Sequence, residues 1–235
     1  MEKDIINWLK FQLKKCRKKG FVLGLSGGLD SSFTAYLCKK ATNNVLGLIL
    51  PCQSRKKDIK DALYIAKKFN INTKIIDLTK IFENYIKLLP YYNKMSVVNI
   101  KPRLRMITLY YFANALDYLV VGTGNKSELK VGYFTKYGDG GVDLLPLGNL
   151  YKTEIKVLAE KVGIPERIIN KPPSAGLWQG QTDEKELGIT YTQLDRILLS
   201  LEKGKKIRNK KLKDINNIIK QTKHKLCVPA IFRKS

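Results

Sequence analysis

The stretch at residues 20–41, GFVLGLSGGLDSSFTAYLCKKA, constrains the fold of this chain more than any other. Residues 21–25 are mostly apolar and predict a short buried strand. The glycine-rich run SGGLDSS follows at 26–32, and apolar residues at helical spacing come after it. A buried strand that passes through a glycine pair into a helix is typical of an α/β fold.

The run SGGLDSS also predicts an anion-binding site. A glycine pair brings bare backbone N–H groups close to a ligand, and the N-terminus of the following helix attracts negative charge, most plausibly phosphate. The kinase-type pattern GxxxxGK(S/T) is absent, so the loop is not of that kind. A simpler interpretation is a glycine turn in which Asp30 or Ser31 caps the helix.

Strands and helices alternate through the first half of the chain. Helices are predicted at 2–19 (with Gly20 as C-cap), 58–69, 79–89 and 103–116, and a loop at 91–96. A buried strand is predicted at 45–50, and further strands at 73–76 and 118–121. This alternation predicts a doubly wound, mainly parallel sheet flanked by helices. Ligands bind such a sheet where its strands end, here after Leu25, Leu50 and Val121.

Residues 122–146 form the second informative stretch, rich in glycine and without the periodicity of a helix longer than two turns. A loop of this length in a compact domain is usually a binding loop, and its aromatic residues argue against simple disorder. Further helices are predicted at 150–163, 191–201 and within 203–225, with an irregular stretch at 171–184. No linker or repeat is visible, so residues 1–235 are expected to form one domain.

The net charge of +24, from 44 basic and 20 acidic residues, would attract anions. Two explanations stay open. One is genome bias plus a polyanionic small substrate, with no specific nucleic acid expected, and the other is real nucleic-acid contact. The four cysteines are scattered without a CxxC pair, which indicates a reducing compartment and argues against a zinc or iron–sulfur site. Neither a secretory signal nor a membrane span is visible, so a cytoplasmic location is expected.

The string SGGLDS resembles the PP-loop of the N-type ATP pyrophosphatases, which cleave ATP between the α and β phosphates. The later combination of GTGNKSE, GYFTKYGDGG and PLGNLYKTE is similar to the bacterial ammonia-dependent NAD synthetases, and other PP-loop enzymes do not carry it. KPRLRM, KPPSAGL, DEKELG and the HK pair match as well, in the expected order. The resemblance therefore covers nearly the whole chain and implies the adenine nucleotide alpha hydrolase-like fold.

This resemblance also implies a reaction. ATP adenylates the nicotinate carboxylate of deamido-NAD with release of pyrophosphate, and ammonia then displaces AMP to give NAD. No glutamine-hydrolysing domain is visible in the 235 residues, so free ammonia is the implied nitrogen source. The family is a symmetric homodimer, and the apolar faces of the first helix and of 103–116 are the expected contacts.

The family's residues for ATP and for the metal can be carried over one by one. The implied ATP contacts are Gly24, Leu25, Ser26, Gly27, Gly28, Leu29, Asp30, Ser31, Thr123, Lys152 and Ser174. Asp30 and Glu128 would hold Mg²⁺, because a cation that bridges phosphates prefers oxygen ligands. A cation at Lys152 would offset the charge that develops as pyrophosphate leaves. Without the resemblance, Glu128 could be a surface glutamate, and Lys152 and Ser174 would not stand out.

The implied contacts with deamido-NAD are Arg103, Lys136, Asp143, His224 and Lys225. The guanidinium of Arg103 can bind two phosphate oxygens at once, and Asp143 would suit ribose hydroxyls. His224 is the only histidine of the chain, and a lone histidine is often just a surface residue. Its place beside Lys225 matches a family substrate contact.

Two segments depart from the family pattern. KKDIKDA, at 56–62, replaces a helix start that is often acid-rich, so Gln53 and Arg55 are the remaining candidates for adenine contacts. The chain continues as HKLCVPAIF where basic residues often follow the HK pair. The contacts of the adenine ring and the docking of the C-terminal segment therefore stay open.

Two other functions compete with this one. A tRNA-modifying ATP pyrophosphatase would share the PP-loop and suit the charge, but thiolating members usually carry paired cysteines and lysidine-forming members carry extra C-terminal domains. A non-catalytic nucleotide-binding or nucleic-acid-binding module would explain the charge, but not why Asp30, Glu128 and Lys152 occur together. Formation of AMP that depends on both deamido-NAD and ammonia would separate the three.

Overall fold

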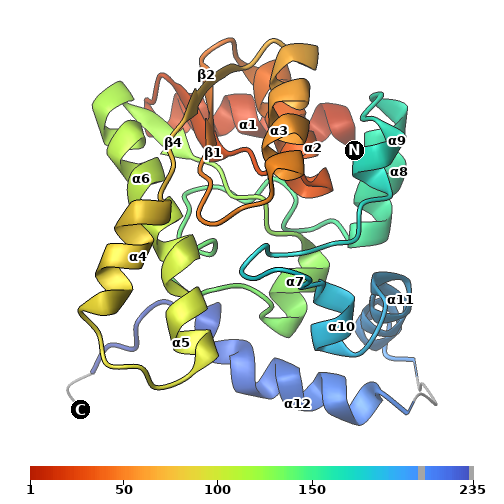
Figure 1. Ribbon diagram of the computed structural model, residues 1–235. Coiled ribbons are helices and arrows are strands. Elements are labelled where there is room, and N and C mark those ends of the chain that lie inside the picture. The colour runs from red at the N-terminus through yellow and green to blue at the C-terminus, as the bar shows by residue number, and fades with distance from the viewer. Residues whose placement is uncertain (206–209, 233–235) are drawn as a thin grey trace.

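The computed structural model describes residues 1–205 and 210–232. Within these residues, four parallel strands form one sheet in the order β3-β2-β1-β4 (Figure 1). The strands are β1 (Gly20–Gly24), β2 (Val45–Ile49), β3 (Asn72–Ile75) and β4 (Tyr118–Val120). A parallel sheet whose strands are joined by helices confirms the predicted fold class.

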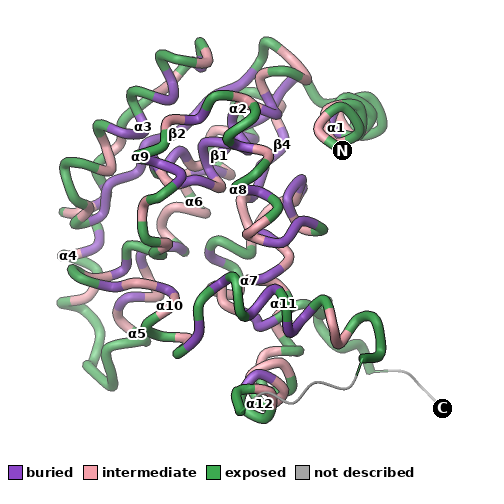
Figure 2. Tube along the Cα trace, turned by 90° about the vertical axis from the view of Figure 1, so that its right-hand side faces the viewer, coloured by how far each residue is buried: buried purple, intermediate pink, exposed green. Residues whose placement is uncertain are grey.

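Helices cover both faces of the sheet (Figure 1). One face packs against α1 (Glu2–Cys16), α2 (Leu29–Ala41), α3 (Lys56–Lys68), α8 (Lys152–Lys161) and α9 (Glu166–Ile169), and the other against α4 (Thr79–Lys87) and α6 (Ile100–Leu116). In β1, Phe21 and Leu23 join the first core and Val22 the second. This strand is buried on both faces, which explains its apolar run. Figure 2 shows the buried chain concentrated at the central strands.

A second group of helices lies below the sheet in Figure 1. It contains α5 (Lys94–Val98), α7 (Lys126–Val131), α10 (Asp183–Leu187), α11 (Tyr191–Glu202), α12 (Leu212–Thr222) and the 3₁₀ turn Lys223–Lys225. Val131, Leu194 and Ile215 pack together in a small core that joins α7, α11 and α12.

Gly20 is not a helix C-cap, so that prediction is wrong. Helix α1 ends at Cys16, and Arg17 takes the left-handed conformation (φ 53°) that closes it. Gly20 instead begins β1, where a Cβ atom would lie 2.3 Å from the carbonyl oxygen of Asn44. The glycine is required because the chain approaches the start of β2 so closely.

The prediction also misses three short helices. The expected loop at 91–96 contains the start of α5, which a capping box between Asn93 and Ser96 initiates. Helices α9 and α10 have only 4 and 5 residues. Helices this short show too little of the 3.6-residue period to be recognised from apolar spacing.

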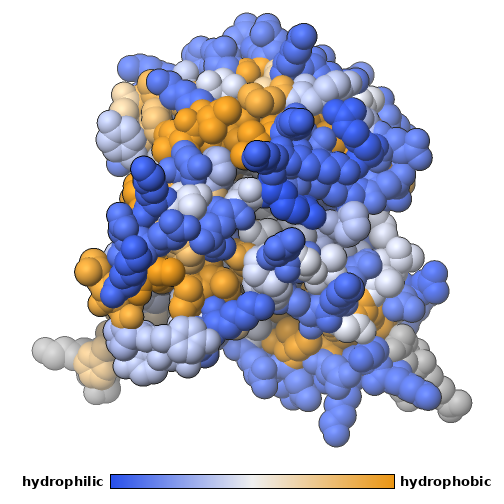
Figure 3. All heavy atoms as spheres, in the orientation of Figure 1, coloured by the Kyte–Doolittle hydropathy of each residue, from blue (hydrophilic) through white to orange (hydrophobic). Residues whose placement is uncertain are grey.

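Exposed apolar side chains lie on β3, α4 and α6, and Figure 3 shows apolar surface over α4 and the neighbouring edge of the sheet. Ile75, Ile81 and Tyr111 are 51%, 55% and 67% exposed. On α1, Phe11 is 58% exposed. In the described part of the chain, no helix combines the length and the apolar character needed to cross a membrane.

Candidate active site

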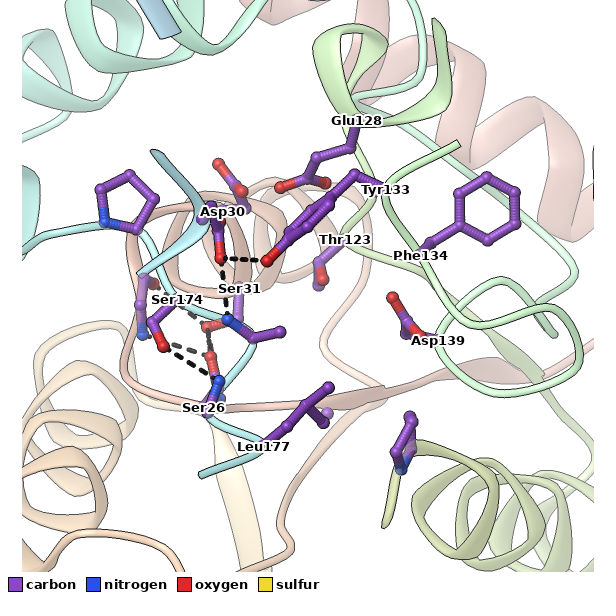
Figure 4. Close-up of a pocket in the computed structure, with 18 of the residues that line it drawn as sticks. Ser26, Asp30, Ser31, Thr123, Glu128, Tyr133, Phe134, Asp139, Ser174 and Leu177 are labelled. Atoms are coloured by element: carbon purple, nitrogen blue, oxygen red, sulfur yellow. Dashed lines mark hydrogen bonds between the residues drawn. The ribbon is translucent and has the colours of Figure 1, made fainter. Parts of the chain in front are cut away.

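A cavity of about 1060 Å³ opens at the carboxyl edge of the sheet. Leu25, Leu50 and Val121, which directly follow β1, β2 and β4, all line it, as predicted. Residues from 132–139 and 169–184 form much of the remaining wall. In Figure 4, Ser26, Ser31 and Ser174 lie toward one side of this cavity, and Phe134 and Asp139 lie toward the other.

The phosphate loop, residues 26–32, is organised by its own hydroxyl groups. Ser31 Oγ accepts from the Ser26 N–H (3.2 Å), and the Gly28 N–H donates to Ser26 Oγ (3.3 Å). Helix α2 has Gly28 as N-cap and no side-chain capping bond, so the alternative in which Asp30 or Ser31 caps the helix is wrong. The first N–H groups of α2 are therefore left for an anion.

Asp30, Glu128 and Lys152 meet beside the phosphate loop, and Figure 4 shows the two carboxylates near each other. The Nζ atom of Lys152 lies 2.5 Å from Asp30 Oδ2 and 3.8 Å from Glu128 Oε1. The side chain of Glu128 is 17% exposed, so its alternative as an ordinary surface glutamate is wrong.

Asn125, from the stretch GTGNKSE, orients both carboxylates. It caps α7: its Oδ1 accepts from the Glu128 N–H (3.0 Å), while its own N–H donates to Glu128 Oε2 (3.2 Å). Its Nδ2 atom donates to Asp30 Oδ2 (3.2 Å). This capping box therefore does more than begin a helix, because it fixes Glu128 at the cavity.

The surroundings shift the pKa values of Glu128 and Lys152. Burial raises the pKa of Glu128 above its usual value; the charge of Lys152 opposes this shift and that of Asp30 adds to it. Burial lowers the pKa of Lys152, but the charges of Asp30 and Glu128 outweigh this effect and raise it above its usual value. Lys152 therefore carries its positive charge at neutral pH.

The two carboxylates fit a cation that bridges phosphates. Asp30 Oδ1 is buried and has no hydrogen-bond partner in the described part of the chain. Within residues 1–205 and 210–232, no three His, Cys, Asp or Glu side chains gather as a metal site. Magnesium commonly takes one or two carboxylates from the protein and its other ligands from phosphates and water. Asp30 and Glu128 thus suit a metal that is completed by a bound nucleotide.

The other predicted ATP residues converge on the same cavity, with one exception. Thr123 and Ser174 reach it from different segments, and Figure 4 shows them on opposite sides of Ser31. The lining residues include every predicted ATP contact except Gly27. Gly27 instead faces α3, where a Cβ atom would lie 2.4 Å from the carbonyl oxygen of Asp58.

Four predicted substrate residues, Arg103, Lys136, His224 and Lys225, line the cavity and form what we call the basic group. Arg103 Nη2 lies 3.4 Å from the Lys136 carbonyl oxygen, and Lys136 Nζ donates to the His224 carbonyl (2.9 Å). Lys225 Nζ donates to the carbonyls of Gly132 (2.7 Å) and Phe134 (2.9 Å). These bonds fasten the Lys223–Lys225 turn to the loop after α7.

Asp143 is not brought into the cavity. Its side chain accepts from the Tyr110 hydroxyl (2.9 Å) and from the Val120 N–H (2.8 Å), and the residue is exposed. These bonds tie the loop after α7 to α6 and β4. Its contact with a ribose stays a prediction.

Several charged residues that line the cavity were not predicted, among them Arg105 and Asp139. Arg105 donates from Nε to the Leu50 carbonyl (3.2 Å), and burial lowers the pKa of its guanidinium. Asp139 accepts from the Thr135 N–H (2.9 Å), and burial raises the pKa of its carboxyl. Arg105 could have been found, because it lies one turn before Leu109 on the buried face of α6, where charge is rare.

Comparisons with known proteins agree with this geometry. Residues 1–229 match the family model described as NAD synthase. The NH(3)-dependent NAD(+) synthetase of Archaeoglobus fulgidus is 44% identical over 233 residues, which cover 97% of this chain and 94% of that protein.

Two solved structures are similar over their full lengths. The NMN synthetase from Francisella tularensis has a TM-score of 0.92 at 36% identity, covering 99% of this chain and 97% of that one. The NH3-dependent NAD synthetase from Campylobacter jejuni has a TM-score of 0.86 at 32% identity, with the same coverage.

Proposed function

The chain belongs to the NAD synthase family, and we propose that its cavity is the place where ATP and deamido-NAD react. The protein catalyses the ATP-dependent amidation of deamido-NAD to NAD with ammonia, so it is a ligase that forms a C–N bond. One observation supports this site above all others. The phosphate loop, Asp30, Glu128 and Lys152 line the same cavity as Arg103 and Lys136, which belong to family-matching stretches.

Each of the two chemical steps makes one bond and breaks another. A nicotinate carboxylate oxygen attacks the α-phosphorus of ATP, and the bond to pyrophosphate breaks, which leaves the NAD-adenylate. Ammonia then attacks the carboxyl carbon, the C–O bond to AMP breaks, and the nitrogen loses a proton. The overall products are NAD, AMP and pyrophosphate.

The phosphate loop and Lys152 would act in the first of these steps. The N–H groups at the start of α2 would bind the pyrophosphate oxygens, and Lys152 would neutralise the charge that grows as the bond breaks. Asp30 and Glu128 would hold Mg²⁺, which would supply further neutralisation of phosphate charge. The chain's own contribution is thus positioning and electrostatics, which carry most phosphoryl-transfer catalysis.

The test is an assay of AMP formation with ATP, Mg²⁺, deamido-NAD and ammonium. We expect AMP and NAD to form in equal amounts, and neither to form when deamido-NAD or ammonium is left out. Glutamine should not replace ammonium as the nitrogen source. AMP formed without deamido-NAD, or a new covalent modification of added tRNA, would overturn the assignment in favour of a tRNA-modifying enzyme.

A mononucleotide acceptor is the second candidate, because the Francisella tularensis structure is that of an NMN synthetase. The acid form of NMN would present the same nicotinate carboxylate but would lack the adenylate half of deamido-NAD. A hydrogen bond from a charged group to that half is worth about 1.5–3 kcal/mol, or roughly 10- to 100-fold in affinity. We therefore expect deamido-NAD to give the higher kcat/KM, and a preference for the mononucleotide would reassign the acceptor.

Arg103→Ala and Lys136→Ala should each raise the KM for deamido-NAD more than the KM for ATP. Both side chains belong to the basic group, apart from the phosphate loop. Loss of a charge-assisted phosphate contact predicts an increase of roughly 10-fold or more in the KM for deamido-NAD. Steady-state kinetics with each substrate varied in turn measure the difference.

Arg196→Ala is the matched control for this pair, since it removes an exposed arginine on α11 that does not line the cavity. It should change neither constant. Equal increases in both KM values for Arg103→Ala or Lys136→Ala would contradict a substrate role and indicate a folding defect.

We also propose a single domain, a cytoplasmic location and a symmetric homodimer. The exposed Trp8 and Phe11 on α1 and the exposed Ile107 and Tyr111 on α6 would supply apolar contacts for a partner copy. No specific nucleic-acid partner is proposed for the positive charge. Light scattering at several protein concentrations tests the dimer directly.

A further inference from the structure

Lys171 is a residue to which the proposed reaction gives no role. It precedes the Pro172–Pro173 pair and lies three residues before Ser174. Its Nζ atom lies 2.6 Å from Asp58 Oδ1, 3.0 Å from Asp61 Oδ2 and 3.2 Å from the carbonyl oxygen of Gly27. One ammonium group therefore joins helix α3, the 171–181 segment and the backbone of the phosphate loop.

The bond to Gly27 fixes the orientation of a particular peptide group. The described residues contain no cis peptide bond, so the Gly27–Gly28 peptide is trans and its C=O and N–H groups point in opposite directions. Lys171 holds the C=O on the α3 side. The N–H of Gly28 consequently points at Ser26 Oγ (3.3 Å), and both of these residues line the cavity.

Gly27 itself cannot be replaced without moving this peptide. Its φ of +73° is the left-handed conformation that favours glycine. An added Cβ atom would lie 2.4 Å from the Asp58 carbonyl oxygen and 2.8 Å from the Ala62 nitrogen. The phosphate loop is thus pressed against α3, and Lys171 bonds to the loop and to α3 at the same place.

We propose that Lys171 is a positioning residue: by holding the Gly27 carbonyl, it keeps the Gly28 N–H and the Ser26 hydroxyl bonded to it in place at the part of the cavity where pyrophosphate leaves during adenylation. This inference rests on the proposed function of the cavity. Because Lys171 and Ser174 belong to one short segment, the shape of the phosphate loop depends on where that segment lies. Nucleotide binding and placement of the 171–181 segment are therefore coupled.

The two aspartates distinguish this role from direct phosphate binding. The side chain of Lys171 is 14% exposed, and its charge is balanced by Asp58 and Asp61. A lysine that bound phosphate directly would bind it more strongly once freed from one of these carboxylates. A positioning lysine that lost one of these carboxylates would be less well fixed and would hold the Gly27 carbonyl less well, so phosphate would bind more weakly.

Lys171→Met removes the ammonium group while keeping the length of the side chain. The fold should persist, because each aspartate keeps one arginine: Arg55 Nε lies 2.9 Å from Asp58 Oδ2, and Arg167 Nε lies 3.3 Å from Asp61 Oδ1. We expect inorganic pyrophosphate to bind on the order of 10-fold more weakly to this variant. Deleting an oxyanion-hole donor lowers kcat by roughly 10²-fold or more, and the effect here should be smaller because the Gly28 N–H is misplaced and not removed. The KM for ATP should rise and the KM for deamido-NAD should not.

Arg167→Met is the matched control, because Arg167 shares Asp61 with Lys171 but makes no bond to the phosphate loop. It should leave pyrophosphate binding unchanged, and thermal unfolding of both variants will show whether the fold is intact. Asp61→Asn separates the two roles: weaker pyrophosphate binding by this variant supports positioning, and tighter binding shows that Lys171 binds phosphate itself.

The proposal would be overturned if Lys171→Met bound pyrophosphate as well as the wild-type protein does. It would also be overturned if Arg167→Met lost as much pyrophosphate affinity as Lys171→Met.

Titration calorimetry with pyrophosphate and Mg²⁺ needs no acceptor substrate. A failure of the proposed function would appear in the AMP assay of the wild-type protein. A failure of the positioning role would appear only in the comparison of the variants' pyrophosphate affinities.

Discussion

Asp30→Asn is expected to lower NAD formation by about 10³-fold while the fold stays intact. Asparagine keeps the size of the side chain but removes the charge. Asp30 Oδ1 has no hydrogen-bond partner in the described part of the chain, and Oδ2 accepts from Lys152 and Asn125. The substitution therefore removes a ligand of the proposed metal and the ion-pair partner of Lys152 at once. Rates of AMP and NAD formation measure the effect.

Asp117→Asn is the control for that experiment. Asp117 carries the same charge but forms an exposed ion pair with Lys18, away from the residues that line the cavity. Its left-handed backbone (φ 61°) is one that asparagine adopts readily, so this variant should fold and work normally. Near-normal pyrophosphate release by Asp30→Asn would show that the metal role is wrong.

Lys152→Met is expected to lower kcat by roughly 10²- to 10³-fold, the range measured for loss of one group that stabilises developing charge. The charges of Asp30 and Glu128 keep the lysine protonated, so methionine removes a full positive charge next to the phosphate loop. The variant also leaves two nearby carboxylates without their ammonium. Its thermal stability should therefore be lower and should rise more on addition of Mg²⁺ than that of the wild-type protein.

Lys161→Met, at the exposed end of the same helix, serves as the control and should change neither kcat nor the response to Mg²⁺. If Mg²⁺ stabilises Lys152→Met no more than the wild type, then Asp30 and Glu128 do not share a cation. If kcat is unaffected, Lys152 does not act on the leaving pyrophosphate.

The sequence predicted those site residues that lie at the ends of strands or within family motifs. Leu25, Leu50 and Val121 follow buried strands, and parallel strands bring their carboxyl ends to one edge. Asp30 and Glu128 lie within a few residues of such ends, so their meeting could be expected. The reason that Glu128 faces the cavity, its capping box with Asn125, became clear only from the structure.

What the sequence could not predict are bonds between side chains and backbone far apart in the chain. Lys225 resembles a free substrate cation, yet its ammonium is held by the carbonyls of Gly132 and Phe134. Lys171 resembles any lysine of a lysine-rich chain, and its bond to Gly27 depends on tertiary packing. Asp143 lies between two family-matching motifs, GYFTKYGDGG and PLGNLYKTE, but it bonds to Tyr110 and β4 outside the cavity. Such bonds join residues that are far apart in the chain, so no regular spacing in a single sequence reveals them.

The turn Lys223–Lys225 has a consequence for how the protein is made. The phosphate loop, residues 26–32, leaves the ribosome well before His224 and Lys225, which lie far downstream in the chain. Domains generally fold from the N-terminus during synthesis. The half of the cavity for ATP could therefore assemble on the ribosome well before the basic group is complete. An unfinished chain would hold nucleotide without being able to use it.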